Sequence, residues 1–171
     1  PKSSEAKNYE DDGYENTTVN LKLGYNFDEN NRVSTSYEII DTEVDYDKEI
    51  YHPAPSYKLD LAKSADDLSK AKTKTHLANL TYENRNDIAL TKVYTNYSNF
   101  KREYTDASRD EYKGVIKEYG VNTSIDYLNS SNLTIGADYK KFENKANIDK
   151  DYNNKGIFIS NTNKFFDDKT I

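Results

Sequence analysis

Apolar and polar side chains alternate without interruption along residues 19–27, VNLKLGYNF. The apolar positions are Val19, Leu21, Leu23, Tyr25 and Phe27, and the residues between them are asparagine, lysine and glycine. A period of two residues predicts a β-strand with one apolar and one polar face. The apolar face of such a strand packs against a second sheet in a soluble protein and against lipid in a membrane barrel.

The same alternation recurs in pairs of segments that are joined by short polar turns. The pairs are residues 19–27 with 32–40, residues 76–82 with 88–100, and residues 118–127 with 132–140. Residues 156–166 open a further pair. Each pair predicts a β-hairpin. We therefore expect an all-β fold, an antiparallel up-and-down meander of about seven strands, with the chain stopping at the start of an eighth.

The facing of residues 88–100 is ambiguous from the sequence. We expect one face to carry Ala89, Thr91, Val93, Thr95 and Tyr97, and the other to carry Lys92 and Asn96. Long charged connections are expected between the hairpins, in the regions of residues 41–72, 104–114 and 143–155. All short turns then lie at one end of the sheet and all long loops at the other.

The composition restricts the class of protein. Only 35% of the residues are hydrophobic and the mean hydropathy is −1.04, so a soluble core of ordinary size is difficult to fill. The aromatic content of 13%, with 16 tyrosines, and the regular pattern argue against disorder. A net charge of −6 argues against a nucleic-acid partner. The chain has no cysteine and shows no enzyme signature.

Three features favour lipid as the partner of the apolar face. Short turns opposite long loops are typical of outer-membrane barrels, and tyrosines near strand ends are typical of their interfacial girdles. Charged residues inside strands, such as Lys22, Glu38 and Asp126, fit a wet lumen. The residues expected to face lipid are Val19, Leu21, Leu23, Tyr25, Phe27, Val121, Ile125, Leu133 and Ile135. A soluble antiparallel sheet with one solvated face remains the alternative.

Two stretches resemble the barrel of TonB-dependent outer-membrane receptors. LTIGADYKKFENK is similar to a receptor strand that ends in a G-x-[DE]-[YF] motif, here Gly136, Asp138 and Tyr139. The stretch that follows is similar to a receptor strand through Gly156, Phe158, Phe165, Asp168 and Lys169. Residues 17–38 also resemble a receptor hairpin.

The resemblance implies an internal part of a large bacterial outer-membrane barrel, residues 1–171, without its plug domain or terminal strand. Such receptors capture a scarce nutrient, commonly a ferric siderophore, haem or cobalamin. They import it with energy from a TonB-type coupling protein that acts through the plug, which this stretch does not contain. Outer-membrane lipid and lipopolysaccharide are the implied surroundings. A passive porin-like barrel and a soluble adhesive β-domain are the alternative functions.

Acidic residues alternate in DTEVDYDKE, which follows the second predicted strand. In an extended conformation they line one side, and hard cations such as calcium bind several such oxygens. The candidate calcium ligands are Asp41, Glu43, Asp45 and Asp47. A solvated acidic loop is the alternative reading, and no other cofactor is expected.

Two further loop regions carry residues suited to ligand capture. IYHPAPSY places Tyr51, His52 and Tyr57 around two prolines, where aromatic rings could stack on a flat ligand. FKREYTDASRDEYK supplies Lys101, Arg102 and Arg109, and basic side chains favour anionic iron chelates. Ordinary packing of the aromatic loop and mixed surface charge are the alternatives.

Overall fold

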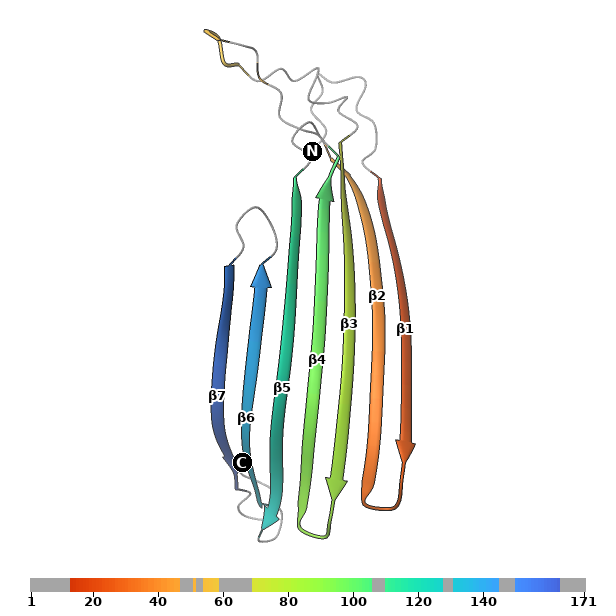
Figure 1. Ribbon diagram of the computed structural model, residues 1–171, viewed down its shortest axis with the longest axis vertical. Helices are drawn as coiled ribbons and strands as arrows, with labels where there is room; N and C mark the ends of the chain where they lie inside the picture. The colour runs from red at the N-terminus through yellow and green to blue at the C-terminus, as the bar shows by residue number, and fades with distance from the viewer. Residues whose placement is uncertain are drawn as a thin grey trace.

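The computed structural model describes residues 13–46, 51, 54–58, 69–105, 110–127, 131–144 and 150–163. These residues form one open sheet of seven antiparallel strands in chain order, β1-β2-β3-β4-β5-β6-β7 (Figure 1). The strands are β1 (Tyr14–Asn26), β2 (Asn31–Tyr46), β3 (Ser69–Arg85), β4 (Ala89–Tyr104), β5 (Glu111–Tyr127), β6 (Ser131–Asn144) and β7 (Lys150–Thr162). The prediction of an all-β up-and-down meander is therefore confirmed.

The register confirms the predicted facing of the strands. Leu21 pairs with Tyr37, Tyr37 with Ala78, and Ala78 with Tyr97, so these side chains share one face. Val93 pairs with Val121, which also settles the facing that was ambiguous for β4. Most turn-side apolar residues therefore share one face of the sheet, whereas Leu90, Tyr94 and Phe158 lie on the other.

The strands extend further into the charged segments than the sequence predicted. β2 continues to Tyr46, β4 to Tyr104 and β6 to Asn144. Asp41, Glu43 and Asp45 are consequently strand residues, as are Lys101 and Arg102, which we had expected in a loop. Cross-strand ion pairs explain the error, because opposite charges on neighbouring strands stabilise a ladder that apolar periodicity alone does not reveal. Asp47, His52 and Arg109 lie outside the described residues.

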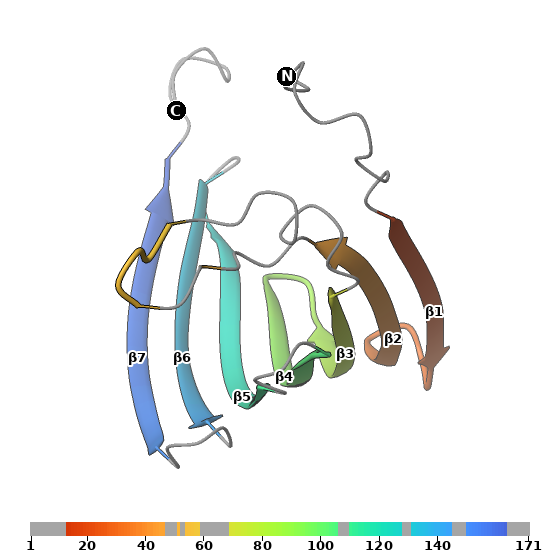
Figure 2. The same cartoon turned by 90° about the horizontal axis from the view of Figure 1, so that it is seen from above.

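The sheet is curved into an open trough (Figure 2). The turn-side apolar residues lie on its convex face, where side chains spread apart, and several remain about half exposed. Side chains on the concave face converge. A Cβ added to Gly136 would come within 3.0 Å of the Cβ of Asn122 and within 2.3 Å of the Phe158 ring. Glycine at this position therefore permits the close approach that the curvature requires.

Little of the sheet is buried against itself. Among the described residues, Ala71 and Val115 are the buried hydrophobic side chains, and no side chain is less than 2% exposed. Each strand contacts only its sequence neighbours. The apolar residues of the convex face are thus not covered by any described part of the chain.

Candidate functional site

The convex face carries a band of apolar and threonine side chains, which we call the apolar band. It crosses all seven strands near the end that holds the short turns. Its members are Val19, Leu21, Leu23, Val33, Thr35, Leu80, Val93, Thr95, Val121, Thr123, Ile125, Leu133, Ile135, Ala137, Ile157 and Ile159. Leu21 is 56% exposed and Ile157 87% exposed. An exposed apolar area on this scale marks an interaction surface.

Tyrosines border the apolar band on both sides. The loop-side row contains Tyr37, Tyr97, Tyr119 and Tyr139, and the turn-side row contains Tyr25, Tyr82 and Tyr127. Tyr119 and Tyr139 stack with their ring centroids 6.5 Å apart, and the Tyr37 hydroxyl lies 2.8 Å from Nδ1 of His76. Tyr82 and Tyr127 donate their hydroxyl protons to asparagine side chains. Tyr37, Tyr82 and Tyr127 thus each contribute an apolar ring and a hydroxyl with a hydrogen-bond partner.

On β5 the separation of the two bordering tyrosines is close to the thickness of a lipid layer, whereas on β3 Tyr82 lies only four residues from Ala78, which is in register with Tyr37 and Tyr97. Tyr119 and Tyr127 are eight residues apart on β5, which is about 26 Å along an extended strand. At the strand tilt of about 40° found in membrane barrels, this becomes about 20 Å along the membrane normal, close to the ~25 Å apolar band of such barrels.

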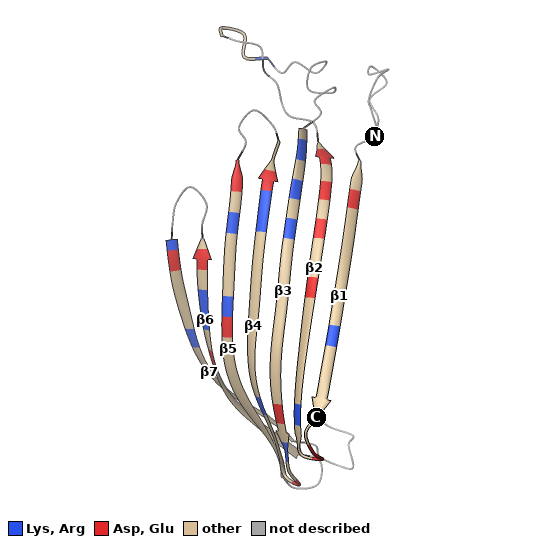
Figure 3. Ribbon diagram, turned by 45° about the vertical axis from the view of Figure 1, so that its right-hand side comes forward, with Lys and Arg blue, Asp and Glu red and all other residues tan. Residues whose placement is uncertain are grey.

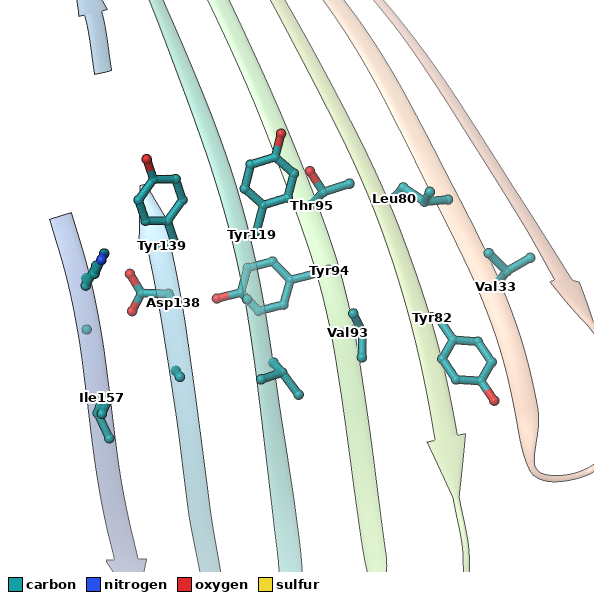
Figure 4. Close-up of a pocket in the computed structure, with 15 residues that line it drawn as sticks. Val33, Leu80, Tyr82, Val93, Tyr94, Thr95, Tyr119, Asp138, Tyr139 and Ile157 are labelled. Atoms are coloured by element: carbon teal, nitrogen blue, oxygen red, sulfur yellow. The ribbon is translucent and has the colours of Figure 1, made fainter. Parts of the chain in front are cut away.

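A broad hollow lies within the apolar band, with a volume of about 810 Å³. Figure 4 shows Val33, Leu80, Val93 and Tyr119 arranged along it. The ring of Tyr94, by contrast, lies on the other face of the sheet, where it covers Gly120. A Cβ atom added to Gly120 would lie only 2.3 Å from Cζ of that ring. The hollow therefore has walls of apolar side chains and is open to the surroundings.

Above the loop-side tyrosine row, the register places charged residues on the convex face. Figure 3 shows charged positions gathered along the loop-side parts of the strands. We call this region the charged belt. Its lysines are Lys70, Lys72, Lys74, Lys101, Lys113, Lys117 and Lys141, and its acids are Asp41, Glu43, Asp45, Glu103, Glu111, Glu143 and Asp151. With Glu15 of β1, which lies opposite Glu43 on the same face, the belt carries eight acids against seven lysines and is close to neutral.

Ion pairs join neighbouring strands within the charged belt. Lys70 lies 2.7 Å and Lys72 2.9 Å from the two oxygens of Glu43, and their hydrogen bonds lower the pKa of Glu43 to about 2. Hydrogen bonds from Lys113 and Lys101 lower the pKa of Glu111 to about 2 in the same way. These carboxylates therefore stay ionised down to strongly acidic pH.

The predicted calcium ligands belong to this belt. Asp41, Glu43 and Asp45 do share one face of β2, as their alternate spacing predicted, but they lie opposite Lys74, Lys72 and Lys70. Their charge is thus balanced by lysines of β3. The described residues contain no cluster of three metal-ligating side chains. A calcium site remains a prediction, and the fourth candidate, Asp47, is outside the described residues.

The predicted ligand-binding residues do not form one site. Lys101 points to the convex face and Arg102, its neighbour on β4, to the concave face. The Arg102 guanidinium lies 5.2 Å from the centroid of the Tyr104 ring, a cation–π contact. Tyr51 and Tyr57 are exposed residues of the β2–β3 connection. None of the described contacts brings them to Lys101 or Arg102.

The concave face has the opposite order of polarity. Level with the apolar band it is polar, and one row of side chains crosses four strands: Asn79 donates to Asn96 at 2.6 Å, Asn96 to Glu118 at 3.0 Å, and Lys140 pairs with Glu118 at 3.1 Å. We call this row the polar ladder. The half-buried polar groups of this row therefore find hydrogen-bond partners within the sheet. Such a row is typical of a face that borders water.

Level with the charged belt, the concave face is aromatic. A hollow of about 300 Å³ is lined by Phe100, Tyr112, Gly114, Ile116, Phe142 and Tyr152, and we call it the aromatic hollow. Phe142 and Tyr152 stack in parallel with centroids 4.4 Å apart. Tyr104 makes edge contacts to Tyr46 and Tyr112, each at 6.0 Å. Flat rings with one face open can stack on a flat ligand.

Sequence reasoning missed the aromatic hollow, although a signal was present. Along β4, Val93 and Tyr97 are at odd positions, whereas Phe100 and Tyr104 are at even positions, as are Leu90 and Tyr94 nearer the turn. The even positions place these aromatic residues on the concave face. The sequence prediction ended this strand at Phe100 and assigned the residues that follow to a charged connection.

No protein-family model matches this chain, and no curated protein matches it. The resemblance to TonB-dependent receptors therefore rests on the residues named above. In the described part of the chain, no helix has the length and apolar character needed to cross a membrane.

Proposed function

We propose that this chain forms part of the wall of a bacterial outer-membrane β-barrel. The observation that carries the proposal is the apolar band on the convex face, bordered on both sides by tyrosines. In a soluble sheet, such a band would be covered by a second layer. In a membrane, lipid covers it, the tyrosines lie at the two interfaces, and the charged belt projects beyond the outer leaflet.

Closure of the barrel is part of the proposal. β1 and β7 each pair with one neighbour among the described strands, so one edge of each offers unpaired backbone donors and acceptors. Unpaired backbone groups are very costly in lipid. Further strands on both sides would satisfy them, in agreement with a barrel that is larger than this sheet.

Within that barrel, we infer a receptor that captures a nutrient for active uptake, rather than a passive pore. The aromatic hollow supports capture, because it lies on the lumen side near the loop end, where a ligand would arrive from outside. Ferric siderophores, haem and cobalamin present flat or aromatic surfaces that stacked rings bind well. Energy coupling through a TonB-type protein and a plug is inferred from the resemblance alone.

A cysteine scan tests the membrane assignment. The chain has no cysteine, so single substitutions along β5 from Tyr119 to Tyr127 can be labelled one at a time in native membranes. We expect odd positions to resist a water-soluble maleimide and even positions, which face the lumen, to react. Equal reactivity of both sets in membranes, or a protein recovered in the soluble fraction, would refute the proposal.

A further inference from the structure

A polar hollow lies on the concave face between β1, β2 and β3, toward the end that holds the short turns. Its volume is about 380 Å³. The lining residues that belong to the concave face are Lys22, Gly24, Arg32, Ser34, Ser36 and Asn79. Among the described residues, no carboxylate lines it. We call it the cationic hollow. It is separate from the aromatic hollow, whose lining belongs to β4–β7.

The register gathers the polar groups of the cationic hollow. Lys22 of β1 lies directly opposite Ser36 of β2, and Gly24 directly opposite Ser34. The guanidinium of Arg32 reaches from β2 over β1, because its Nη2 atom lies 3.0 Å from the position that a Cβ on Gly24 would take. Positions two apart on a strand share a face at about 7 Å, so the guanidinium over Gly24 is a neighbour of Lys22. Two cations and two hydroxyls thus border one space.

The two cations have no carboxylate partner within the described part of the chain. Glu83, which the register places opposite Arg32, pairs with Lys92 at 2.8 Å. Glu38 is one row nearer the loops than Lys22, and its Oε2 accepts a hydrogen bond of 2.5 Å from an asparagine of β1. The nearby acids are thus engaged elsewhere, and the charges of Lys22 and Arg32 remain uncompensated.

The two serines add neutral donors to the cationic hollow. Ser34 and Ser36 are half-buried, and none of the described hydrogen bonds engages their hydroxyl groups. Half-buried hydroxyls normally have a hydrogen-bond partner. Asn79 closes the hollow on the β3 side, where its amide donates to Asn96 of the polar ladder at 2.6 Å. A ligand in the hollow would therefore supply the partner that both hydroxyls lack.

The surrounding strand positions carry an excess of positive charge. From the level of Glu38 to the turns, the concave face of β1–β4 has Lys22, Arg32, Arg85 and Lys92 against Glu38 and Glu83. At the same levels, β5–β7 have the opposite excess, with Glu118, Asp126 and Asp138 against Lys140. In the adjoining turn, Asp28 and Glu29 do not line the hollow, and Asp28 accepts hydrogen bonds from Asn30 and Asn31. The field of these strands therefore directs an anion to the β1–β3 side of the concave face.

The number of donors and the volume indicate the class of anion. A carboxylate offers two oxygens, whereas the terminal phosphate of an ester offers three, which suits an arginine, a lysine and two hydroxyls better. A volume of about 380 Å³ is within the range of about 300–1,000 Å³ that is usual for small-molecule sites. It exceeds the share of one water molecule, about 30 Å³, roughly twelvefold, so a free ion would leave most of it unfilled. No aromatic ring is among the described lining residues, which favours a hydrophilic body.

We propose that the cationic hollow binds the phosphate group of a small hydrophilic phosphate ester of the sugar phosphate class. Arg32 donates two parallel N–H groups to phosphate oxygens, Lys22 provides a point charge, and Ser34 and Ser36 donate from the strand surface. The inference goes beyond the proposed function and does not depend on it, because the concave face borders water in a barrel lumen and in a soluble sheet alike.

The test is a calorimetric titration of the natural full-length protein, in non-ionic detergent micelles, with glucose 1-phosphate. The test variant is K22Q/R32Q. The matched control is R85Q/K150Q, which also removes one arginine and one lysine from the concave face but outside the hollow. We expect wild type and control to bind the ester saturably and the test variant to bind it at least about tenfold more weakly, since charge-assisted hydrogen bonds are lost.

A second variant separates a built site from general charge attraction. S34A/S36A keeps both cations and removes only the two hydroxyls, and we expect it to weaken binding several-fold. Unchanged affinity in S34A/S36A, or equal losses in K22Q/R32Q and R85Q/K150Q, would overturn the site. Thermal unfolding midpoints of all variants are measured alongside, so that a lost fold is not counted as lost binding.

Titrations with glucose and with inorganic phosphate identify the part of the ligand that is bound. We expect glucose not to bind and inorganic phosphate to bind more weakly than the ester. Binding of glucose as tight as that of the ester would overturn the phosphate assignment, and equally tight inorganic phosphate would identify a free-anion site instead. The cysteine scan along β5 tests the membrane assignment separately, so that the failure of one proposal is distinguishable from the failure of the other.

Discussion

Lys117 of β5 donates a hydrogen bond to Oε1 of Glu143 on β6 at 2.8 Å, and Lys141 pairs with the same oxygen at 3.1 Å. Glu143 is buried, with 8% of its surface exposed. The two lysines lower the pKa of its carboxyl to about 2, from an ordinary value of 4.5. A carboxylate with two ammonium partners thus joins β5 to β6 on the convex face.

This cluster predicts how stability changes with acid. A lowered folded-state pKa contributes stability that is fully present above the unfolded pKa, near 4.5, and is lost as the pH falls toward about 2. We expect the unfolding midpoint to be steady above about pH 5 and to fall between pH 4.5 and 2. In E143Q, the midpoint at neutral pH should be lower and its acid dependence weaker, as measured by thermal unfolding in micelles. An unchanged acid profile in E143Q would contradict this account.

We expect that adding a side chain at Gly136, on the concave face, lowers the free energy of unfolding. Gly136→Ala places a methyl group against the Asn122 Cβ and the Phe158 ring, so the sheet has to open locally. We expect a loss of about 1–3 kcal/mol, as for other overpacked sites. The matched control is Gly24→Ala on β1, where the added methyl meets only the mobile end of Arg32, at 3.0 Å. Urea unfolding of both variants measures the difference, and equal losses would show that close approach is not the cause.

A charge on the convex face predicts failure of membrane insertion. Leu80→Arg places a cation in the apolar band, and an arginine near the middle of a bilayer costs a barrel about 2–4 kcal/mol. Thr81→Arg, one residue further along β3, places the same charge on the concave face. We expect the first variant to be depleted from the outer-membrane fraction and the second to be retained. Similar yields of the two would argue for a solvated convex face.

We expect that removing aromatic rings from the aromatic hollow weakens ligand binding. The chain has 16 tyrosines and no tryptophan, so coloured ligands such as haem or a ferric catecholate can be titrated through tyrosine fluorescence. Tyr112→Ala combined with Phe142→Ala should weaken saturable quenching about tenfold, since each lost aromatic contact is worth about 0.5–1.5 kcal/mol. Tyr25→Ala, at the turn end of the convex face, should leave affinity unchanged. Equal affinity in the double variant would exclude the hollow as the capture site.

The sequence by itself determined the strands, their order and the sharing of one apolar face. These follow from local alternation. Within a strand, alternate side chains share a face, and a short turn fixes the register of the two strands of a hairpin. Val19, Leu21 and Leu23 were assigned correctly for this reason. The alternation also identified Asp41, Glu43 and Asp45 as neighbours on one side.

Only the tertiary structure decided what lies opposite those neighbours. Asp41 faces Lys74 across strands that are separated by a long connection, and no local pattern predicts that register. The cationic hollow between Lys22, Ser36 and Asn79 likewise exists only once three strands are aligned. Curvature was also beyond local reasoning, because it arises from convergence of side chains such as Asn122 on the neighbouring Gly136. Alternation specifies which face a residue joins, whereas register and curvature depend on contacts between residues that are distant in the chain.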